Sequence, residues 1–203
     1  MLDGLARRLI DPPLDAAGRR LARLGGTANG VTWGSFAVGL LAALAITQGA
    51  FLLGLVLILL SRIGDGLDGA VARASGGGPS DYGGFLDISL DFAFYGAVPL
   101  AFAFADPDAY ALAAATLIAS FYLNGGTFLA FAVMAEKRTL RSDARGTKSL
   151  YFTTGLAEGT ETIAVFVAMC LYPAAFAPIA YGFAALCCVT AGARIALAAR
   201  SFA

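Results

Sequence analysis

Histidine is absent from this chain, and charged residues are scarce. The lack of histidine excludes a Ser-His-Asp triad, a His-ligated zinc ion and any phosphohistidine mechanism. Charged residues account for 14% of the 203 residues, whereas soluble domains average about 25%. The three cysteines, Cys170, Cys187 and Cys188, have apolar neighbours and no CxxC spacing, so we interpret them as packing residues. Any chemistry must therefore depend on carboxylates.

Hydrophobic residues dominate instead, at 59% of the chain, and the mean hydropathy is +0.75. Too few polar residues remain to cover a soluble surface, which excludes a disordered chain, a nucleic-acid-binding protein and a secreted disulfide scaffold. We predict an all-α polytopic membrane protein, a single domain over residues 1–203 with a six-helix transmembrane bundle over 31–196. The predicted spans are residues 31–48, 51–72, 83–104, 109–135, 149–172 and 174–196.

The N-terminal arm, residues 1–26, interleaves arginines with leucines and contains Pro12 and Pro13. No apolar run in the arm is long enough for the core of a signal peptide. Basic, leucine-bearing segments are typical of amphipathic helices that lie on an anionic membrane surface. We therefore expect one or two interfacial helices, with the prolines marking a break. A frayed basic tail is the alternative.

The basic residues indicate how the bundle is oriented. The short connections near residues 49, 106 and 173 contain no lysine or arginine. All 14 lysines and arginines fall on the other side: in the arm, at Arg62 and Arg73 toward the end of the second helix, between Lys137 and Lys148, and near the C-terminus. The positive-inside rule then places both termini and the two long loops in the cytoplasm.

Four aspartates lie inside the predicted spans, Asp65 and Asp68 in the second and Asp87 and Asp91 in the third. Each costs about 2.5–3.5 kcal/mol in a helix that crosses lipid, so each needs a compensating partner. The spacing puts each pair on one helical face, and a short loop makes the two helices antiparallel neighbours. Converging carboxylates repel one another unless cations lie between them. Oxygen ligands select hard divalent ions, Mg2+ or Mn2+, and four aspartates suffice for a two-metal centre.

Small and basic residues accompany the aspartates. Four glycines stand beside them: Gly66, Gly69, Gly83 and Gly84. They leave room for a substrate to approach the backbone, although close helix packing is the alternative reason for glycines. Arg73 lies two turns beyond the first aspartate and supplies a positive charge suited to a phosphate oxygen.

This part of the chain resembles the signature of the CDP-alcohol phosphatidyltransferase family. It contains Asp65-x-x-Asp68-Gly69-x-x-Ala72-Arg73, followed by Gly83-x-x-x-Asp87-x-x-x-Asp91. So many fixed positions make this a far more specific match than a lone short motif. The whole chain is further similar to a bacterial inner-membrane branch of that family. The resemblance implies a multi-pass enzyme of phospholipid biosynthesis that transfers a phosphatidyl group from CDP-diacylglycerol to a small polar alcohol and releases CMP.

The resemblance also implies roles for individual residues. In the family, the positions of Asp65, Asp68 and Asp87 bind two metal ions, and that of Asp91 contacts the second metal and acts as the base. The nucleotide diphosphate is held at the positions of Gly69 and Arg73. Further contacts to the nucleotide are implied in the turn before the first span and before the third: Thr27, Ala28, Asn29, Gly30 and Ser80. Ala28 stands where the family usually has proline. Family members are usually homodimers.

The binding site for the acceptor alcohol is less clearly marked. The basic segment from Glu136 to Lys148 either interacts with anionic lipid headgroups or helps to bind a phosphorylated acceptor such as glycerol 3-phosphate. Glu158 and Glu161, three residues apart on the fifth span, either face the same cavity or are structural. The candidate acceptor-binding residues are Lys137, Arg141, Arg145, Lys148, Glu158, Glu161 and Arg194.

Two other classes of membrane protein also place carboxylates in spans. An ion transporter would use them along an ion pathway, but it predicts acidic residues spread over the membrane depth rather than clustered beside glycine and arginine. A membrane prenyltransferase would have two aspartate motifs far apart on a longer chain. The clustered motif therefore favours phosphatidyl transfer, with transport as the alternative.

Overall fold

A computed structural model describes residues 3–76, 78, 80–142 and 159–202. The described residues form helices and contain no strand, which confirms the all-α class. The helices are α1 (Asp3–Arg23), α2 (Ala28–Thr47), α3 (Phe51–Ala74), α4 (Asp81–Ala105), α5 (Pro107–Ser142), α6 (Gly159–Leu171) and α7 (Phe176–Phe202), with a 3-10 turn η1 (Pro173–Ala175) before α7.

Among the described residues, four segments are long and apolar enough to cross a membrane: α2, α4, residues 107–138 of α5, and η1 with α7. Helix α3 has 24 residues, but the stretch from residue 62 onward contains Arg62, Asp65, Asp68 and Arg73. Helix α6 has 13 residues, and residues 149–158 of the predicted fifth span lie outside the described residues. The membrane class is confirmed, whereas six crossings stay a prediction.

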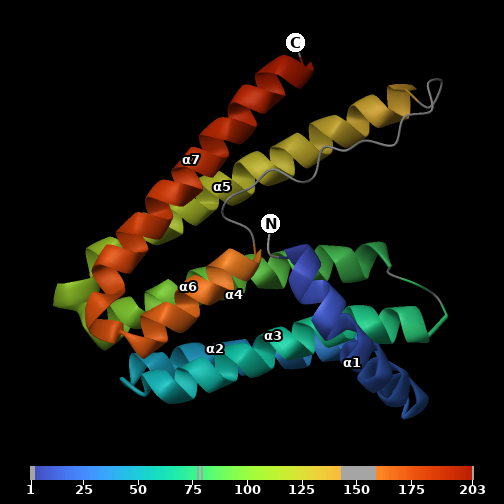
Figure 1. Ribbon diagram of the computed structural model, residues 1–203, viewed down its shortest axis with the longest axis horizontal. Coiled ribbons are helices and arrows are strands. Elements are labelled where there is room, and N and C mark those ends of the chain that lie inside the picture. The colour runs from blue at the N-terminus through green and yellow to red at the C-terminus, as the bar shows by residue number, and fades with distance from the viewer. Residues whose placement is uncertain (1–2, 77, 79, 143–158, 203) are drawn as a thin grey trace.

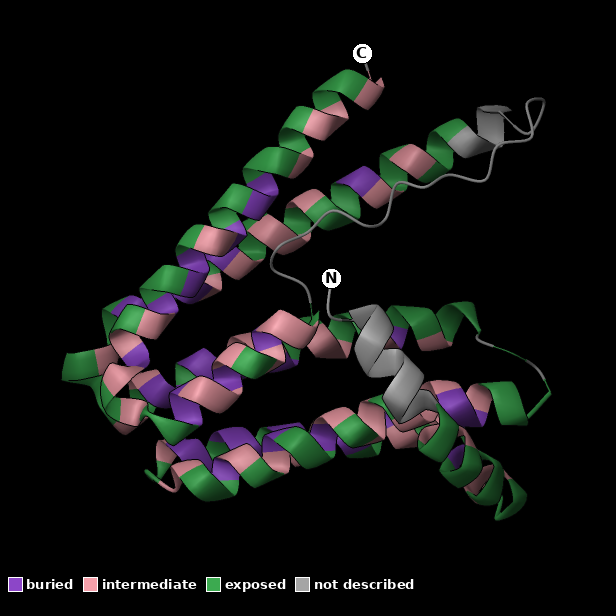
Figure 2. Ribbon diagram, in the orientation of Figure 1, coloured by how far each residue is buried: buried purple, intermediate pink, exposed green. Residues whose placement is uncertain are grey.

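The helices fall into two groups (Figure 1). Helices α2, α3, α4 and α6 lie alongside one another, whereas α5 and α7 pair with each other and diverge from that group. The short connections α2–α3, α4–α5 and α6–η1 lie at one end of the four-helix group, and α1 lies at the other end, against the second half of α3. Buried residues follow the faces that meet other helices, and the outer faces are exposed (Figure 2). The exposed faces are rich in leucine and phenylalanine, as expected of lipid-facing surfaces.

Close packing of α2 on both α3 and α4 fixes how these helices present their polar residues. A Cβ atom at Gly39 would lie 2.8 Å from the ring of Phe94. At Gly64 it would overlap the side chain of Ser35. The Ser61 hydroxyl donates a hydrogen bond to the Ser35 carbonyl across the same interface, at 2.8 Å. These glycines serve helix packing, because small residues let two backbones approach closely.

Helix α1 continues through Pro12 and Pro13, so the predicted break at the prolines is wrong. Proline removes a backbone donor but holds φ near the helical value, and packing against another helix can offset the lost hydrogen bonds. That packing occurs at Gly18, where a Cβ atom would lie 2.7 Å from the Cβ of Ala70 and 3.0 Å from the Val71 nitrogen. Helix α1 therefore rests directly on the second half of α3.

Helix α5 ends at Ser142, so residues 136–142 are helical and do not belong to the predicted loop. The stretch contains no glycine or proline, and its glutamate, lysine and arginine residues are strong helix formers. Arg138 adds a tertiary contact, because its guanidinium donates to the Ser201 and Phe202 carbonyls at 2.6 and 2.5 Å. This contact satisfies backbone acceptors at the end of α7 and fastens it to α5.

Candidate active site

Three of the four predicted aspartates converge between α3 and α4. One oxygen from each of Asp65, Asp87 and Asp91 lies within 4.8 Å of the other two. All three are half-buried. Helical spacing explains the two residues on α4, since positions four apart share a face. The arrangement offers hard oxygen ligands at a separation that one or two divalent cations can bridge.

Helix α2 brings the two acidic helices together. It packs extensively against both α3 and α4, whereas α3 and α4 make few direct backbone contacts. The two acidic helices are nevertheless neighbours through their side chains, as predicted, because Nη1 of Arg62 on α3 lies 2.6 Å from an oxygen of Asp91 on α4. The small residues of α2 allow it to fit closely against both helices. The aspartate side chains then extend across the remaining distance between α3 and α4.

Arg62 is the cation of this cluster, although its position in the sequence predicted only the orientation of the bundle. Its Nη1 lies 2.6 Å from an oxygen of Asp91 and 3.4 Å from an oxygen of Asp65. The guanidinium also stacks 4.2 Å from the ring centroid of Phe94. The sequence contained one indication of the contact between Arg62 and Asp65, because these residues are three positions apart and share a helical face.

The fourth aspartate, Asp68, is not one of the three whose oxygens lie within 4.8 Å of one another, and its carboxylate is oriented by α2. The Thr32 hydroxyl donates to Asp68 Oδ2 at 2.6 Å. Thr32 itself is buried, so this oxygen of Asp68 is held at a defined position. Sequence analysis missed Thr32 because nothing local distinguishes it from the other small polar residues of an apolar helix.

Replacing Thr32 by valine tests this contact. Valine keeps the shape but removes the donor, so Asp68 loses the hydrogen bond that orients it. We expect the KM for CDP-diacylglycerol to rise about tenfold, the size typical for losing a support of a metal or substrate ligand. Thr116→Val on α5, where the hydroxyl only bonds to the Leu112 carbonyl of its own helix, is the matched control. An unchanged KM in Thr32→Val would show that the hydrogen bond has no functional role.

A pocket of about 410 Å³ adjoins the aspartates at the ends of α2, α3 and α4. Two capped helix N-termini face it. Thr27 caps α2 by accepting from the Gly30 N–H at 3.2 Å, and Ser80 caps α4 by accepting from the Gly83 N–H at 3.0 Å. Helix N-termini carry partial positive charge and unpaired N–H groups, which suits an anionic ligand.

Most of the predicted nucleotide residues line this pocket. Its lining includes Thr27, Ala28, Asn29, Thr32, Asp68, Gly69, Ser80, Gly83, Gly84 and Asp87. Gly30 and Gly66 are not among the lining residues, and a Cβ atom at Gly66 would contact Leu14 of α1 at 3.0 Å.

Arg73 is exposed and donates to Asp15 of α1 at 2.8 Å. Helix α1 therefore holds the guanidinium that was predicted to bind the diphosphate.

The predicted acceptor residues are scattered over three helices or fall outside the described residues. Lys137 is exposed on α5, and the side chain of Arg141, like residues 145, 148 and 158, is outside the described part. Glu161 lies in the first turn of α6. That turn is near the aspartates, because a Cβ atom at Gly159 would lie 3.5 Å from the hydroxyl of Tyr95, one turn beyond Asp91.

Arg194, the remaining acceptor candidate, joins α7 to α5. Its Nη1 donates to the carbonyl and side-chain oxygens of Asn124 at 2.9 Å and to the Thr127 hydroxyl at 3.0 Å. Its guanidinium also lies 5.5 Å from the ring centroid of Phe128. These contacts give Arg194 a packing role whether or not it also meets an acceptor.

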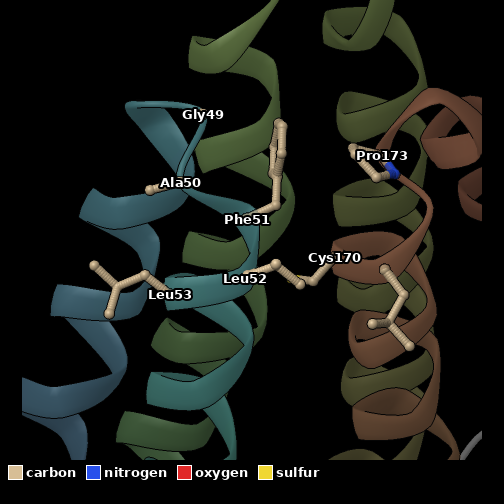
Figure 3. Close-up of a pocket in the computed structure, with 8 residues that line it drawn as sticks. Gly49, Ala50, Phe51, Leu52, Leu53, Cys170 and Pro173 are labelled. Atoms are coloured by element: carbon tan, nitrogen blue, oxygen red, sulfur yellow. The ribbon is translucent and has the colours of Figure 1, made fainter.

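A second hollow, of about 510 Å³, lies at the opposite end of the four-helix group (Figure 3). It is formed by the α2–α3 connection and the end of α6, and its lining residues are Gly49, Ala50, Phe51, Leu52, Leu53, Cys170, Leu171 and Pro173. None of these residues has a charged side chain, in contrast to the pocket beside the aspartates.

Comparison with known proteins agrees with the motif and its geometry. A family model described as CDP-alcohol phosphatidyltransferase matches residues 26–195. The chain is 46% identical over 195 residues to the inner membrane protein YnjF of Escherichia coli, covering 96% of this chain and 94% of that relative. It is 41% identical over 86 residues to an archaetidylinositol phosphate synthase of Pyrococcus horikoshii, covering 42% of this chain and 45% of that relative.

Solved structures share the fold. Two structures of the phosphatidylinositol phosphate synthase of Mycobacterium tuberculosis align with a TM-score of 0.70 at 21% identity. One has CDP-DAG bound, and the alignment covers 90% of this chain and 91% of that one. The other is in complex with manganese and citrate, and the alignment covers 90% and 87%. Since the family model spans most of the chain and one relative is nearly half identical along its length, this membrane protein belongs to the CDP-alcohol phosphatidyltransferase family and is an enzyme of that class.

Proposed function

We propose that this enzyme transfers a phosphatidyl group from CDP-diacylglycerol to a small polar alcohol and releases CMP. The observation that carries the proposal is the position of Asp87, which belongs both to the carboxylate triad and to the lining of the adjoining pocket. A ligand in that pocket would thus meet the acidic cluster directly. The donor is supported by the shared fold of a synthase whose structure contains bound CDP-DAG.

The acidic residues fit a pair of divalent cations, Mg2+ or Mn2+. Asp65, Asp87 and Asp91 present oxygen ligands within 4.8 Å of one another, and this all-oxygen set suits hard cations. Asp68, oriented by Thr32, adds a fourth carboxylate nearby. When bound, such cations neutralise the charge of a diphosphate and polarise the phosphorus under attack.

The pocket residues bind the nucleotide diphosphate in this proposal. The N-termini of α2 and α4 direct backbone N–H groups and partial positive charge at the anion. Gly69, Gly83 and Gly84 line the pocket without side chains, so a diphosphate can approach the backbone. Arg73 adds a full positive charge at the edge, where Asp15 positions it.

Asp91 is the proposed general base. An alcohol is a weak nucleophile until its proton leaves, and a carboxylate within hydrogen-bond reach can accept that proton as the bond to phosphorus forms. Arg62 holds one oxygen of Asp91 at 2.6 Å, which leaves the other oxygen for the acceptor hydroxyl. The reaction is then a direct in-line displacement at the phosphorus that bears diacylglycerol, without a covalent enzyme intermediate.

Location, orientation and assembly complete the proposal. The near-full-length similarity to an inner membrane protein supports a bacterial inner membrane location. We expect both termini and the aspartate cluster on the cytoplasmic side, because the connections at the other end carry no basic residue. A homodimer is expected from the resemblance to the family.

A reaction with labelled donor tests this function. Purified enzyme would be incubated with radiolabelled CDP-diacylglycerol, Mg2+ or Mn2+, and in turn glycerol 3-phosphate, serine, inositol, inositol phosphate and phosphatidylglycerol. Release of CMP with one acceptor, and formation of the matching labelled lipid, would identify the reaction. A phosphorylated alcohol is the first choice because the basic segment at the end of α5 suits a phosphate. No CMP release with any acceptor and either metal ion would contradict the proposal and favour ion transport.

A further inference from the structure

Arg62 places a permanent positive charge where the proposed cations would bind. Its side chain is 14% exposed, and a single nitrogen, Nη1, contacts both Asp91 and Asp65. Nη2 lies 3.2 Å from the Ser61 hydroxyl. Nε is buried and has no hydrogen-bond partner within the part of the chain that the structure describes.

Hydrogen bonding alone does not explain this position of Arg62. Burying a guanidinium with an unsatisfied donor is unfavourable, because the lost hydration is only partly replaced. The offsetting interactions are the two carboxylates and the face of the Phe94 ring. The same carboxylates belong to the triad that could hold a metal ion. Arg62 and a cation at this site would therefore be attracted by the same two carboxylates, Asp91 and Asp65.

We infer that Arg62 is a built-in counter-ion that stabilises the acidic cluster when cations are absent and competes with a divalent cation for Asp91 and Asp65. This inference rests on the metal centre of the proposed function. Without metal ions, the single charge of Arg62 offsets part of the repulsion among the aspartates. The Arg62 guanidinium would repel a cation bound at these carboxylates, and it would have to leave Asp91 or share that carboxylate with the cation. Arg62 is thus a positioning residue that acts through Asp91.

Metal titration of Arg62 variants tests the inference. Binding of Mn2+ alone to the purified full-length protein in detergent can be followed by the electron paramagnetic resonance of the free ion. We expect Arg62→Gln to bind Mn2+ about tenfold more tightly than the unmodified protein, because a nearby positive charge is removed from a partly desolvated site. Since one nitrogen makes both contacts, Arg62→Lys should remain within about threefold of the unmodified protein.

The matched control is Arg73→Gln. It makes the same change in net charge on the same helix, but eight residues beyond Asp65, about 12 Å along the axis, and in an exposed position. Its Mn2+ affinity should stay close to that of the unmodified protein. An affinity of Arg62→Gln that is equal to or weaker than that of the unmodified protein would overturn the inference. If the unmodified protein bound no Mn2+ at all, the proposed metal centre itself would be wrong.

Thermal unfolding separates this role from an ordinary structural ion pair. In EDTA, Arg62→Gln should unfold at a lower temperature than the unmodified protein, and saturating Mn2+ should close most of that difference. If Arg62→Gln does not fold in EDTA, extraction from membranes in Mn2+ should recover folded protein. Equal destabilisation with and without Mn2+, or failure to fold under both conditions, would show a structural pair and contradict competition.

Discussion

Asp91→Asn should reduce turnover about 1000-fold while CDP-diacylglycerol still binds, a loss within the range for removing a general acid or base. Asparagine has nearly the same size and keeps a side-chain oxygen, so the hydrogen bond from Arg62 Nη1 can persist. It cannot accept a proton from an alcohol. The helix and its neighbours should therefore stay in place. Because Asp91 does not line the pocket, CDP-diacylglycerol binding should persist while turnover falls.

Two measurements on the same preparation check this expectation. The rate of CMP release gives kcat, and equilibrium binding of labelled CDP-diacylglycerol gives Kd. The control is Asp108→Asn, the same chemical change in the first turn of α5, where the residue is exposed. That variant should behave as the unmodified enzyme does. If Asp91→Asn retained more than about a tenth of the turnover, Asp91 would not be the base.

Asp87→Asn should abolish both Mn2+ binding and turnover, with each reduced at least about 100-fold, because a ligand matters at least as much as its supporting partners. Asp87 is the member of the triad that also lines the pocket. Removing its charge weakens the binding of a cation at the triad. It also removes the carboxylate that would place such a cation beside a nucleotide diphosphate in the pocket. The loss of turnover should exceed that in Thr32→Val, because Thr32→Val removes only the hydrogen bond that orients Asp68.

The control for this variant lies on the same helix. Asp81 is exposed in the first turn of α4, six residues before Asp87, and does not line the pocket. Asp81→Asn should retain both Mn2+ affinity and CMP release. Mn2+ titration would be run beside the activity assay, so that loss of metal and loss of chemistry can be told apart. Normal Mn2+ affinity in Asp87→Asn would exclude this residue as a ligand.

Features set by local chemistry were predictable from the sequence. The apolar composition determined the membrane class, because the free energy of moving a side chain from water into lipid depends mainly on that side chain itself. Helical spacing put Asp87 and Asp91 on one face, because that relation lies within a single helix. The family resemblance rested on the same short stretch, and the family model confirmed it.

Relations between helices were predicted less well. Arg62 was interpreted only as a topological signal, yet in the folded chain it contacts Asp91, which belongs to another helix. Thr32 is 36 residues from Asp68 in sequence and touches it only because α2 packs on α3. Nothing in the periodicity of either segment indicates which faces meet.

The sequence by itself determined that this protein is a helical membrane protein, that it presents acidic faces on two helices, and to which family it belongs. The tertiary structure decided that α2 joins those helices, that Arg62 neutralises part of the cluster, and that Thr32 orients Asp68. The physical reason is that spacing fixes directions within one helix, whereas contacts between helices depend on the close packing of small residues such as Gly39 and Gly64.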